Sequence, residues 1–353
     1  MRIDTRRAFR EAQLKTLEQA VAQHREEWAA LSRAQQQLEI ENNDAVAKLY
    51  GLEDEVSSYV PLERVSLTNN SAFRWPNKTP EERDILFAEA AIVDLVSYAV
   101  GCMFGRYSLD EPGLILADQG ATVQDYLAKV PSPSFMPDAD NVLPVVDGDW
   151  FEDDIVAKFR LFLRVVFGEE HFEENLRFVE KSLGVTQLRD YFITSKGKSK
   201  FYDDHVKRYK KRPIYWMFSS PKGSFNALVY MHRYSPSTVS TVLNEYLREY
   251  EAKLGASLQN KEREAVGNGS PRQQAMAAKD AERLRKILVE LSEYEHDVLY
   301  PLATRQLEIN LDDGVLVNYL RLGKAVRNFG LESDRNKVEG WDWPVHRLEP
   351  RDA

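Results

Sequence analysis

The 353-residue chain has a single cysteine, Cys102, so it can form neither an internal disulfide nor a zinc site built from several cysteines. A chain without disulfides fits a reducing cytosol. The longest apolar stretch, residues 88–104, is interrupted by Glu89 and Asp94 and is shorter than the roughly 20 residues that cross a bilayer. The first thirteen residues are charged throughout and lack the apolar core of a secretion signal. The sequence therefore predicts a cytoplasmic protein that does not cross a membrane.

The sequence motifs of several common enzyme chemistries are also missing. There is no Walker-type glycine loop, no Gly-x-Ser-x-Gly, no His-Glu-x-x-His and no Cys-x-x-Cys. The six histidines are scattered singly, and no pair has the spacing of metal ligands. The turn Gly101–Gly105 contains two glycines, but it follows an expected helix and not a strand, so a dinucleotide site is not favoured. The residues alone indicate no catalytic, cofactor-binding or metal-binding group.

The composition that is present predicts a folded α+β protein that is mainly α-helical. Apolar side chains make up 43% of the residues, aromatics 11% and charged residues 29%, which suits two or three folded domains. We expect a long coiled-coil-like helical segment over residues 1–60 and a spacer containing a buried helix over residues 61–130. Residues 131–353 are expected to form a mixed domain with a small sheet and a helical hairpin over residues 239–299.

The N-terminal segment has the repeat of a coiled coil or helical bundle. Residues 1–60 contain no proline and one glycine, Gly51, and are rich in good helix formers. Alternate steps of three and four from Leu14 reach an apolar or aromatic residue at eleven of fourteen positions. We expect residues 42–44 to divide this segment into two helices, with Asn43 or Asp44 capping the second. The pattern favours a packing or spacer helix over a helix that binds a specific partner.

Proline, glycine and polar clusters mark the boundaries of the later elements. Thr79 followed by Pro80 predicts the start of a helix that runs to about Met103 and is apolar on more than one face, and hence buried. Residues 131–149 contain four prolines and a glycine and are the clearest candidate domain boundary. The remaining expected elements are helices from Trp150 to Val166 and from Phe172 to Leu183, strands at Ile214–Phe218 and Phe225–Tyr230, helices at Val239–Leu254 and Pro271–Leu299, and a last apolar helix at Gly314–Phe329.

The segment 191–234 differs from the rest of the chain in charge. It holds ten lysines and arginines against two acids, so it carries +8 in a chain whose net charge is −9, and the remainder carries −17. Eleven aromatic residues are interleaved with these cations. Clustered cations and aromatic faces suit a nucleic-acid surface. A solvated helix face followed by a buried hairpin, whose aromatics are core, explains the pattern equally well. The candidate DNA-binding residues are Lys207, Arg208, Lys210, Lys211, Arg212 and Lys222 for phosphate, with Arg233 and Tyr215 near the bases.

Five phrases of the sequence resemble the C-terminal part of the adenine-specific DNA methyltransferases of BREX phage defence, the PglX family. They are KLYGL at residues 48–52, SYAVGCMFGRYSL at 97–109, KRPIYWMFSS at 211–220, LVYMHRY at 228–234 and LDDGVLVNY at 311–319. They occur in family order, and the resemblance extends from about residue 40 to residue 343. That family is related to fused restriction-modification methyltransferases, in which one chain joins a methylase to a target-recognition region.

The resemblance implies the target-recognition and scaffold region of such an enzyme, without its methylase half. Family members carry a Rossmann-like methylase domain with a glycine-containing S-adenosylmethionine motif and an Asn-Pro-Pro-Tyr motif that holds the flipped adenine. Neither motif occurs here, so no catalytic residue is carried over and S-adenosylmethionine is expected in a separate methylase domain. The implied partners are double-stranded DNA and a methylase half or other BREX proteins. The alternative is a protein-interaction module in which the N-terminal helix and the hairpin 239–299 dock other BREX components.

Overall fold

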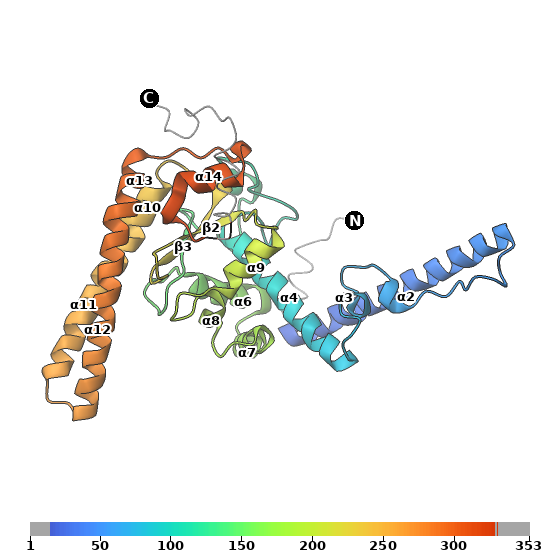
Figure 1. The fold of residues 1–353 in the computed structure, drawn as a ribbon, viewed down its shortest axis with the longest axis horizontal. Helices are drawn as coiled ribbons and strands as arrows, with labels where there is room; N and C mark the ends of the chain where they lie inside the picture. The colour runs from blue at the N-terminus through green and yellow to red at the C-terminus, as the bar shows by residue number, and fades with distance from the viewer. Residues whose placement is uncertain (1–14, 329, 331–353) are drawn as a thin grey trace. The chain divides into compact units, whose positions relative to one another are not determined.

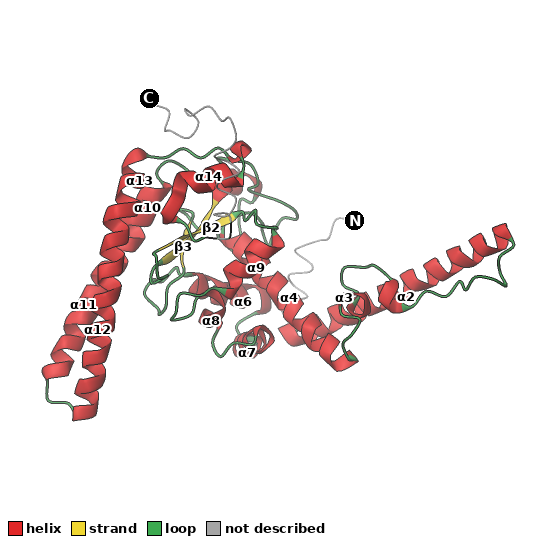
Figure 2. Cartoon of the chain, viewed as in Figure 1, coloured by secondary structure: helices red, strands yellow, loops and turns green. Residues whose placement is uncertain are grey.

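The structure is a computed structural model that describes residues 15–328 and residue 330 (Figure 1). Helices dominate it, and the strands it describes form a single three-stranded sheet (Figure 2). The mainly α-helical α+β class is therefore confirmed. The described chain divides into two compact units, one formed by residues 15–97 and 163–186 and the other by residues 98–162 and 187–330. The division into segments 1–60, 61–130 and 131–353 remains a prediction.

The first unit is built around the long helix α2 (Leu17–Tyr50). Thr16 and Gln19 form a reciprocal capping box at its start, and Gly51, at φ +65°, ends it. The expected break at residues 42–44 is wrong. Asn43 donates a side-chain hydrogen bond to the Ser58 carbonyl, and Asp44 pairs with Lys48 one turn later, so both residues are accommodated within one continuous helix.

Further short elements complete this unit. They are η1 (Leu62–Arg64), α3 (Ser71–Arg74), the first part of α4 (Pro80–Met103) and α7 (Phe172–Leu183). The predicted start of α4 is confirmed, because the Thr79 hydroxyl accepts from the Glu82 amide while the Glu82 carboxylate accepts from the Thr79 amide. The predicted bounds of α7 and its end at Gly184 are also confirmed.

Helix α4 is long and apolar enough to cross a membrane by length and composition alone, with a mean hydropathy of 1.8 in its most apolar window. This is weak evidence for a span, because the core helix of a soluble protein passes the same test. Ile92, Val96, Ala99 and Val100 are fully buried, as a core helix requires. Cys102, with 1% of its surface exposed, is likewise a packing residue.

The second unit contains the sheet, in which β1 (Val142–Pro144) and β2 (Tyr215–Ser219) flank β3 (Asn226–Tyr230). Both pairings are antiparallel, and Tyr215 lies opposite Tyr230. The predicted hairpin is confirmed. Strand β1 was not predicted, because it lies in the proline-rich segment 131–149; Pro144 is tolerated there since β1 is an edge strand. Every residue of β2 and β3 is buried, so the sheet is covered on both faces.

The helices of this unit surround the sheet, and the predicted helical hairpin is confirmed among them. Helix α12 (Pro271–Tyr294) packs along α11 (Arg248–Val266), and Ser270 with Gln273 forms a capping box at the start of α12 (Figure 1). The other helical elements are α5 (Val123–Lys129), α6 (Ile155–Phe167, which continues into the first unit), α8 (Leu188–Phe192), α9 (Lys200–Arg208), η2 (Met231–Arg233), α10 (Thr238–Thr241), α13 (Tyr300–Arg305), η5 (Leu311–Asp313), α14 (Val315–Leu322) and η6 (Gly323–Ala325). The last expected helix ends at Leu322, and Phe329 lies outside the described residues.

Each arm of the hairpin contains a π-helical turn, η3 (Val242–Leu247) in the first and η4 (Glu295–Leu299) in the second. The two turns lie together, and Arg248, next to η3, pairs with Glu295 of η4 at 2.6 Å. Pro301 explains η4. In an ordinary α-helix the ring of Pro301 would clash with the carbonyl group of Asp297, four residues earlier. The wider π turn separates the two groups.

Candidate nucleic-acid interface

The cations of residues 191–234 are almost all on the surface. Nine of the ten lysines and arginines are exposed, and we call these nine the basic surface. They are Lys196, Lys198, Lys200, Lys207, Arg208, Lys210, Lys211, Arg212 and Lys222. All of the predicted phosphate-contacting residues belong to this set. Helix α9, the loop that follows it, and two turns carry them.

The end of α9 concentrates positive charge. Ser199 caps the helix at its start, accepting from the Tyr202 amide at 3.1 Å. After Arg208 the chain does not continue the helix, because Lys210 and Lys211 both adopt positive φ, at 50° and 62°. The Lys211 amide still donates to the Val206 carbonyl at 2.9 Å, which closes the turn. Five cations thus crowd the helix end whose carbonyl groups attract positive charge.

Two glycines bring the two remaining lysine-bearing turns together. Gly197 lies in the turn 194–198 and Gly223 in the β2–β3 turn, and both have positive φ. A side chain on Gly197 would place its Cβ 2.5 Å from the Lys222 carbonyl oxygen. Only glycine allows this backbone approach. The exposed side chains of Lys196 and Lys222 therefore belong to two turns that touch.

A buried carboxylate fixes the β2–β3 turn to α12. Glu290 is 4% exposed and accepts three hydrogen bonds, from the Ser220 hydroxyl at 2.6 Å, the Lys222 amide at 2.7 Å and the Ser224 hydroxyl at 2.6 Å. A buried carboxylate needs this number of donors to offset the loss of water. The backbone of Lys222 is held in place while its side chain stays in solvent.

A cleft of about 1060 Å³ lies between these two turns, residues 147–150 and the hairpin α11–α12. Lys196, Lys222 and Lys279 line it, and none of the three forms an ion pair with any residue in the described part of the chain. Asp147, which also lines the cleft, is paired with Arg283 at 3.0 Å. Asp149, Asp280, Glu282 and Glu290 also line the cleft, so its charge is mixed, and the exposed part of the basic surface carries the argument for an anionic partner.

The aromatic residues of the segment behave differently from its cations. Ten of the eleven are buried, and only Tyr209 is partly exposed. Tyr215, predicted near the bases, is 1% exposed. Its ring stacks on Phe104 and its amide donates to the His205 imidazole at 3.2 Å. The interpretation of the hairpin aromatics as core is thus confirmed, while the cations remain available to a partner.

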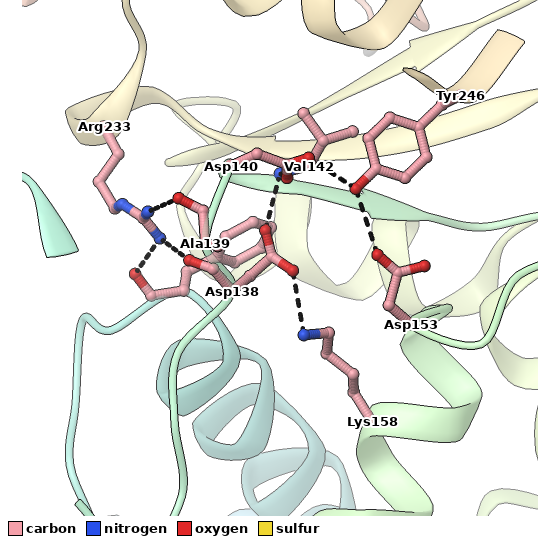
Figure 3. A network of polar contacts seen from close by, with 9 residues as sticks. Asp138, Ala139, Asp140, Val142, Asp153, Lys158, Arg233 and Tyr246 are labelled. Carbon is pink, nitrogen blue, oxygen red and sulfur yellow. Dashed lines mark hydrogen bonds and ion pairs between the residues drawn. The ribbon is translucent and has the colours of Figure 1, made fainter. Parts of the chain in front are cut away.

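Arg233, also predicted near the bases, is buried as well. Its guanidinium donates to the carbonyl oxygens of Phe104 at 3.3 Å, Asp138 at 2.9 Å and Ala139 at 3.1 Å (Figure 3). The side chain is 9% exposed and joins the end of α4 to the loop before β1. We therefore leave Arg233 and Tyr215 out of the proposed DNA-contacting residues. Both side chains are buried, and their hydrogen bonds and ring contacts are made inside the protein.

Three aspartates, Asp138, Asp140 and Asp153, belong to the same network of polar contacts as Arg233 (Figure 3). Asp138 is buried and pairs with Lys158 at 3.0 Å. The Tyr246 hydroxyl lies 2.8 Å from a carboxylate oxygen of Asp140 and 3.2 Å from one of Asp153. Partial desolvation, reinforced by the nearby Asp138, raises the pKa of Asp140 to about 7. Nowhere in residues 15–328 do three or more His, Cys, Asp or Glu side chains gather as metal ligands.

The raised pKa makes stability depend on pH. The folded state favours neutral Asp140, so this contribution is fully present below the ordinary pKa of 3.8 and is lost as the pH rises through about 7. We expect Asp140→Asn to be more stable than the wild type at about pH 8, by up to about 1 kcal/mol, and equally stable near pH 4. Urea unfolding at both pH values measures this. The exposed Asp280→Asn is the control, and equal pH profiles for Asp140→Asn and the wild type would contradict the prediction.

One arrangement near the basic surface was missed by reasoning from the sequence. Arg106, in the turn after α4, donates from Nη1 to the Tyr230 hydroxyl at 2.9 Å. Tyr107 and His232 lie beside it, and all three are partly exposed. The sequence signal for this arrangement is an arginine next to a tyrosine, Arg106 and Tyr107, within the phrase SYAVGCMFGRYSL.

Two curated proteins match most of this chain. Adenine-specific methyltransferase BrxX of Escherichia coli O9:H4 (strain HS) is 35% identical over 299 residues, which is 80% of this chain and 24% of that protein. Adenine-specific methyltransferase PglX of Lacticaseibacillus casei (strain Zhang) is 33% identical over 296 residues, which is 80% of this chain and 22% of that protein. This chain is a relative of the BREX PglX-family methyltransferases. No protein-family model matches it.

The chain spans about a quarter of the length of the curated relatives it matches. Its described residues do not fit a nucleotide-type cofactor site. Such a site lies at the ends of parallel strands, with a glycine turn leading from a strand into a helix. The sheet within residues 15–328 is antiparallel, and the Gly101–Gly105 turn follows α4. No chemical step through S-adenosylmethionine is therefore assigned to these residues.

Proposed function

We propose that this chain is a DNA target-recognition and scaffold region of a BREX-type adenine-specific (N6) DNA methyltransferase. It holds duplex DNA while a methylase domain, absent from this chain, flips the adenine and methylates its exocyclic nitrogen. The observation that supports this is the basic surface. Nine exposed cations occur within 27 residues of a chain whose net charge is −9, and they have the chemistry that phosphate contact requires.

The charge distribution also favours one docking face. Residues outside the segment 191–234 carry −17, so they repel a polyanion and leave the basic surface as the attractive region. Lysine and arginine contacts to phosphate provide affinity and orientation but no sequence information. In this proposal the basic surface fixes the register of the duplex, and a separate group reads its bases.

The remaining parts of the proposal follow from the same role. S-adenosylmethionine belongs to the methylase domain, the partners are double-stranded DNA and that methylase half or other BREX proteins, and the location is the cytoplasm. We expect no methyl transfer by this chain alone. Methylation of adenine by the isolated chain with S-adenosylmethionine would contradict this proposal.

Charge reversal of Lys207, Lys210 and Lys211 to glutamate tests the basic surface. We expect roughly 10- to 100-fold weaker binding of duplex DNA at low salt, because three phosphate contacts become repulsive. The slope of log affinity against log salt should fall by about 2.7, close to 0.9 for each lost contact. Fluorescence anisotropy at several salt concentrations measures both quantities.

The matched control reverses Arg33, Arg272 and Arg305, three exposed arginines outside the basic surface, and gives the same change in net charge. It should keep the wild-type salt slope. If the two triple variants bind alike, or if the lysine variant keeps the wild-type affinity and slope, the basic surface does not contact DNA.

A second candidate function is a protein-interaction module that docks other BREX components. The observation that favours it is the coiled-coil stripe of α2, where Leu38 is 61% and Leu49 79% exposed. Large apolar residues repeated along an exposed helix are typical of a helix–helix interface. A chain that forms a stable complex with purified BREX proteins at high salt, yet fails to shift DNA at low salt, would favour this second function.

A further inference from the structure

A continuous series of rings links the end of α9 to the turn after β3. Centroid distances are 4.8 Å between Tyr209 and His205, 4.8 Å between His205 and Tyr215, 5.4 Å between Tyr215 and Tyr230, and 4.9 Å between Tyr230 and His232. The three middle rings are at most 4% exposed, whereas the two end rings are partly exposed. The series is therefore anchored in the core and reaches the surface at both ends.

Arg106 lies against this series with its orientation fixed. The Tyr230 hydroxyl donates its proton to the Leu116 carbonyl at 2.7 Å, so it acts as an acceptor toward Arg106 Nη1 at 2.9 Å. The guanidinium carbon lies 5.6 Å from the centroid of the Tyr107 ring and 6.0 Å from that of Tyr230. The rings and this hydrogen bond restrict the side chain before any ligand arrives.

The guanidinium retains unused hydrogen-bonding capacity. Arg106 forms no ion pair with a carboxylate in the described part of the chain, and its Nε is buried without a partner. The guanidinium hydrogen-bonds with the hydroxyls of Tyr230 and Tyr107, which leaves further N–H groups unused, and the side chain is partly exposed. The Arg106 guanidinium is positively charged, only donates hydrogen bonds and meets few acceptors inside the protein. It is therefore suited to a ligand group that offers acceptor atoms only.

Arg106 is close to the basic surface. Tyr209, at one end of the ring series, is flanked in sequence by Arg208 and Lys210. Burial, together with the positive charges of Arg208 and Arg106, lowers the pKa of His205 to about 3. Both guanidinium groups therefore act on the same imidazole. Arg106 and the loop after α9 therefore belong to the same neighbourhood of the surface.

We propose that Arg106 is a specificity-determining residue of this DNA surface, and that its guanidinium reads guanine in duplex DNA. The inference rests on the proposed function and deepens it. Guanine presents two acceptors, O6 and N7, on its major-groove edge, and an arginine fork binds both at once. Adenine and cytosine each place a donor on that edge, and they do not match a group that only donates.

The test selects sequences from a random duplex DNA library with the full chain. The wild type should enrich guanine at one position or more. Arg106→Lys keeps the charge but loses the planar fork. It should lose roughly 5- to 100-fold of the preference for guanine at one position. Its affinity for unselected random duplex should change by less than about threefold, because phosphate contacts are retained.

The matched control is Arg212→Lys, the same chemical change within the basic surface, which should leave the sequence preference intact. A second measurement needs no protein variant. Wild-type chain is titrated with a selected duplex carrying 7-deazaguanine at the preferred position, which removes the N7 acceptor. The affinity for the duplex should fall when 7-deazaguanine replaces the guanine at the preferred position. It should not fall when 7-deazaguanine replaces a guanine elsewhere in the duplex.

Several results overturn the inference while leaving the proposed function in place. These are duplex binding with no enriched position, an unchanged guanine preference in Arg106→Lys, or indifference to 7-deazaguanine. A chain that binds no random duplex and shows no salt-dependent affinity would contradict the proposed function itself. That result differs from the three above. Thermal unfolding of Arg106→Lys establishes that it is folded, and the 7-deazaguanine titration decides the matter if it is not.

Discussion

Replacing Arg233 with methionine is expected to lower the free energy of unfolding by about 3–5 kcal/mol. Methionine fills much of the space but donates no hydrogen bond, so the carbonyl groups of Phe104, Asp138 and Ala139 lose their shared donor inside the protein. A buried acceptor without a partner costs about 1–3 kcal/mol. The loss also releases the loop before β1 from the end of α4. Urea unfolding followed by circular dichroism measures the effect.

Two further variants separate this effect from charge alone. Arg233→Lys keeps the positive charge, but an ammonium group lacks the reach of the planar guanidinium, so an intermediate loss is expected. Arg272→Met makes the same change at an exposed position near the start of α12 and should alter stability by less than about 0.5 kcal/mol. An Arg233→Met protein within about 1 kcal/mol of the wild type would show that the three carbonyl contacts contribute little.

Replacing Glu290 with alanine is expected to destabilise the protein by about 3 kcal/mol. Three donors of the β2–β3 turn, the Ser220 and Ser224 hydroxyls and the Lys222 amide, then lose their acceptor. Glu290→Gln keeps one acceptor oxygen, so its loss should be roughly half as large. The exposed Lys279→Ala, on the same helix, is the control for helix propensity. Chemical unfolding provides the free energies.

Hydrogen exchange distinguishes a local effect of Glu290 from a global one. In Glu290→Ala the amides of residues 220–225 should lose protection first, since the turn is released from α12. If DNA binding uses Lys222 as proposed, affinity should also fall, because that lysine is no longer held in position. Wild-type protection in the turn together with wild-type stability would contradict the anchoring role of Glu290.

Much of the secondary structure could be predicted because its signals are local. The end of α7 at Gly184 and the turn between β2 and β3 depend on a few neighbouring residues. Strand β1 was missed because three residues that include Pro144 carry too little pattern to be recognised. The break expected at residues 42–44 was wrong, since asparagine costs a helix only a fraction of a kcal/mol and its side chain finds a partner.

The site depended on contacts that a one-dimensional pattern does not contain. Composition located the basic surface, because exposed lysines follow from charge alone. The burial of Tyr215 and Arg233 could not be predicted, because it is set by residues such as Phe104 and Asp138, about a hundred positions away. Arg106 and Tyr230 are 124 positions apart. Pairs of this kind become visible only when the fold brings them together.

The two adjoining π turns have a consequence for how this hairpin tolerates insertions and deletions. A π turn is wider than an α turn and holds one more residue, so the helix that follows keeps nearly the orientation it would have without that residue. Because η3 and η4 lie together in antiparallel arms, both arms hold their extra residue at the same level of the hairpin. Deleting one residue from η3 should therefore close the wide turn to an α turn and leave the later residues Tyr250 and Leu254 buried.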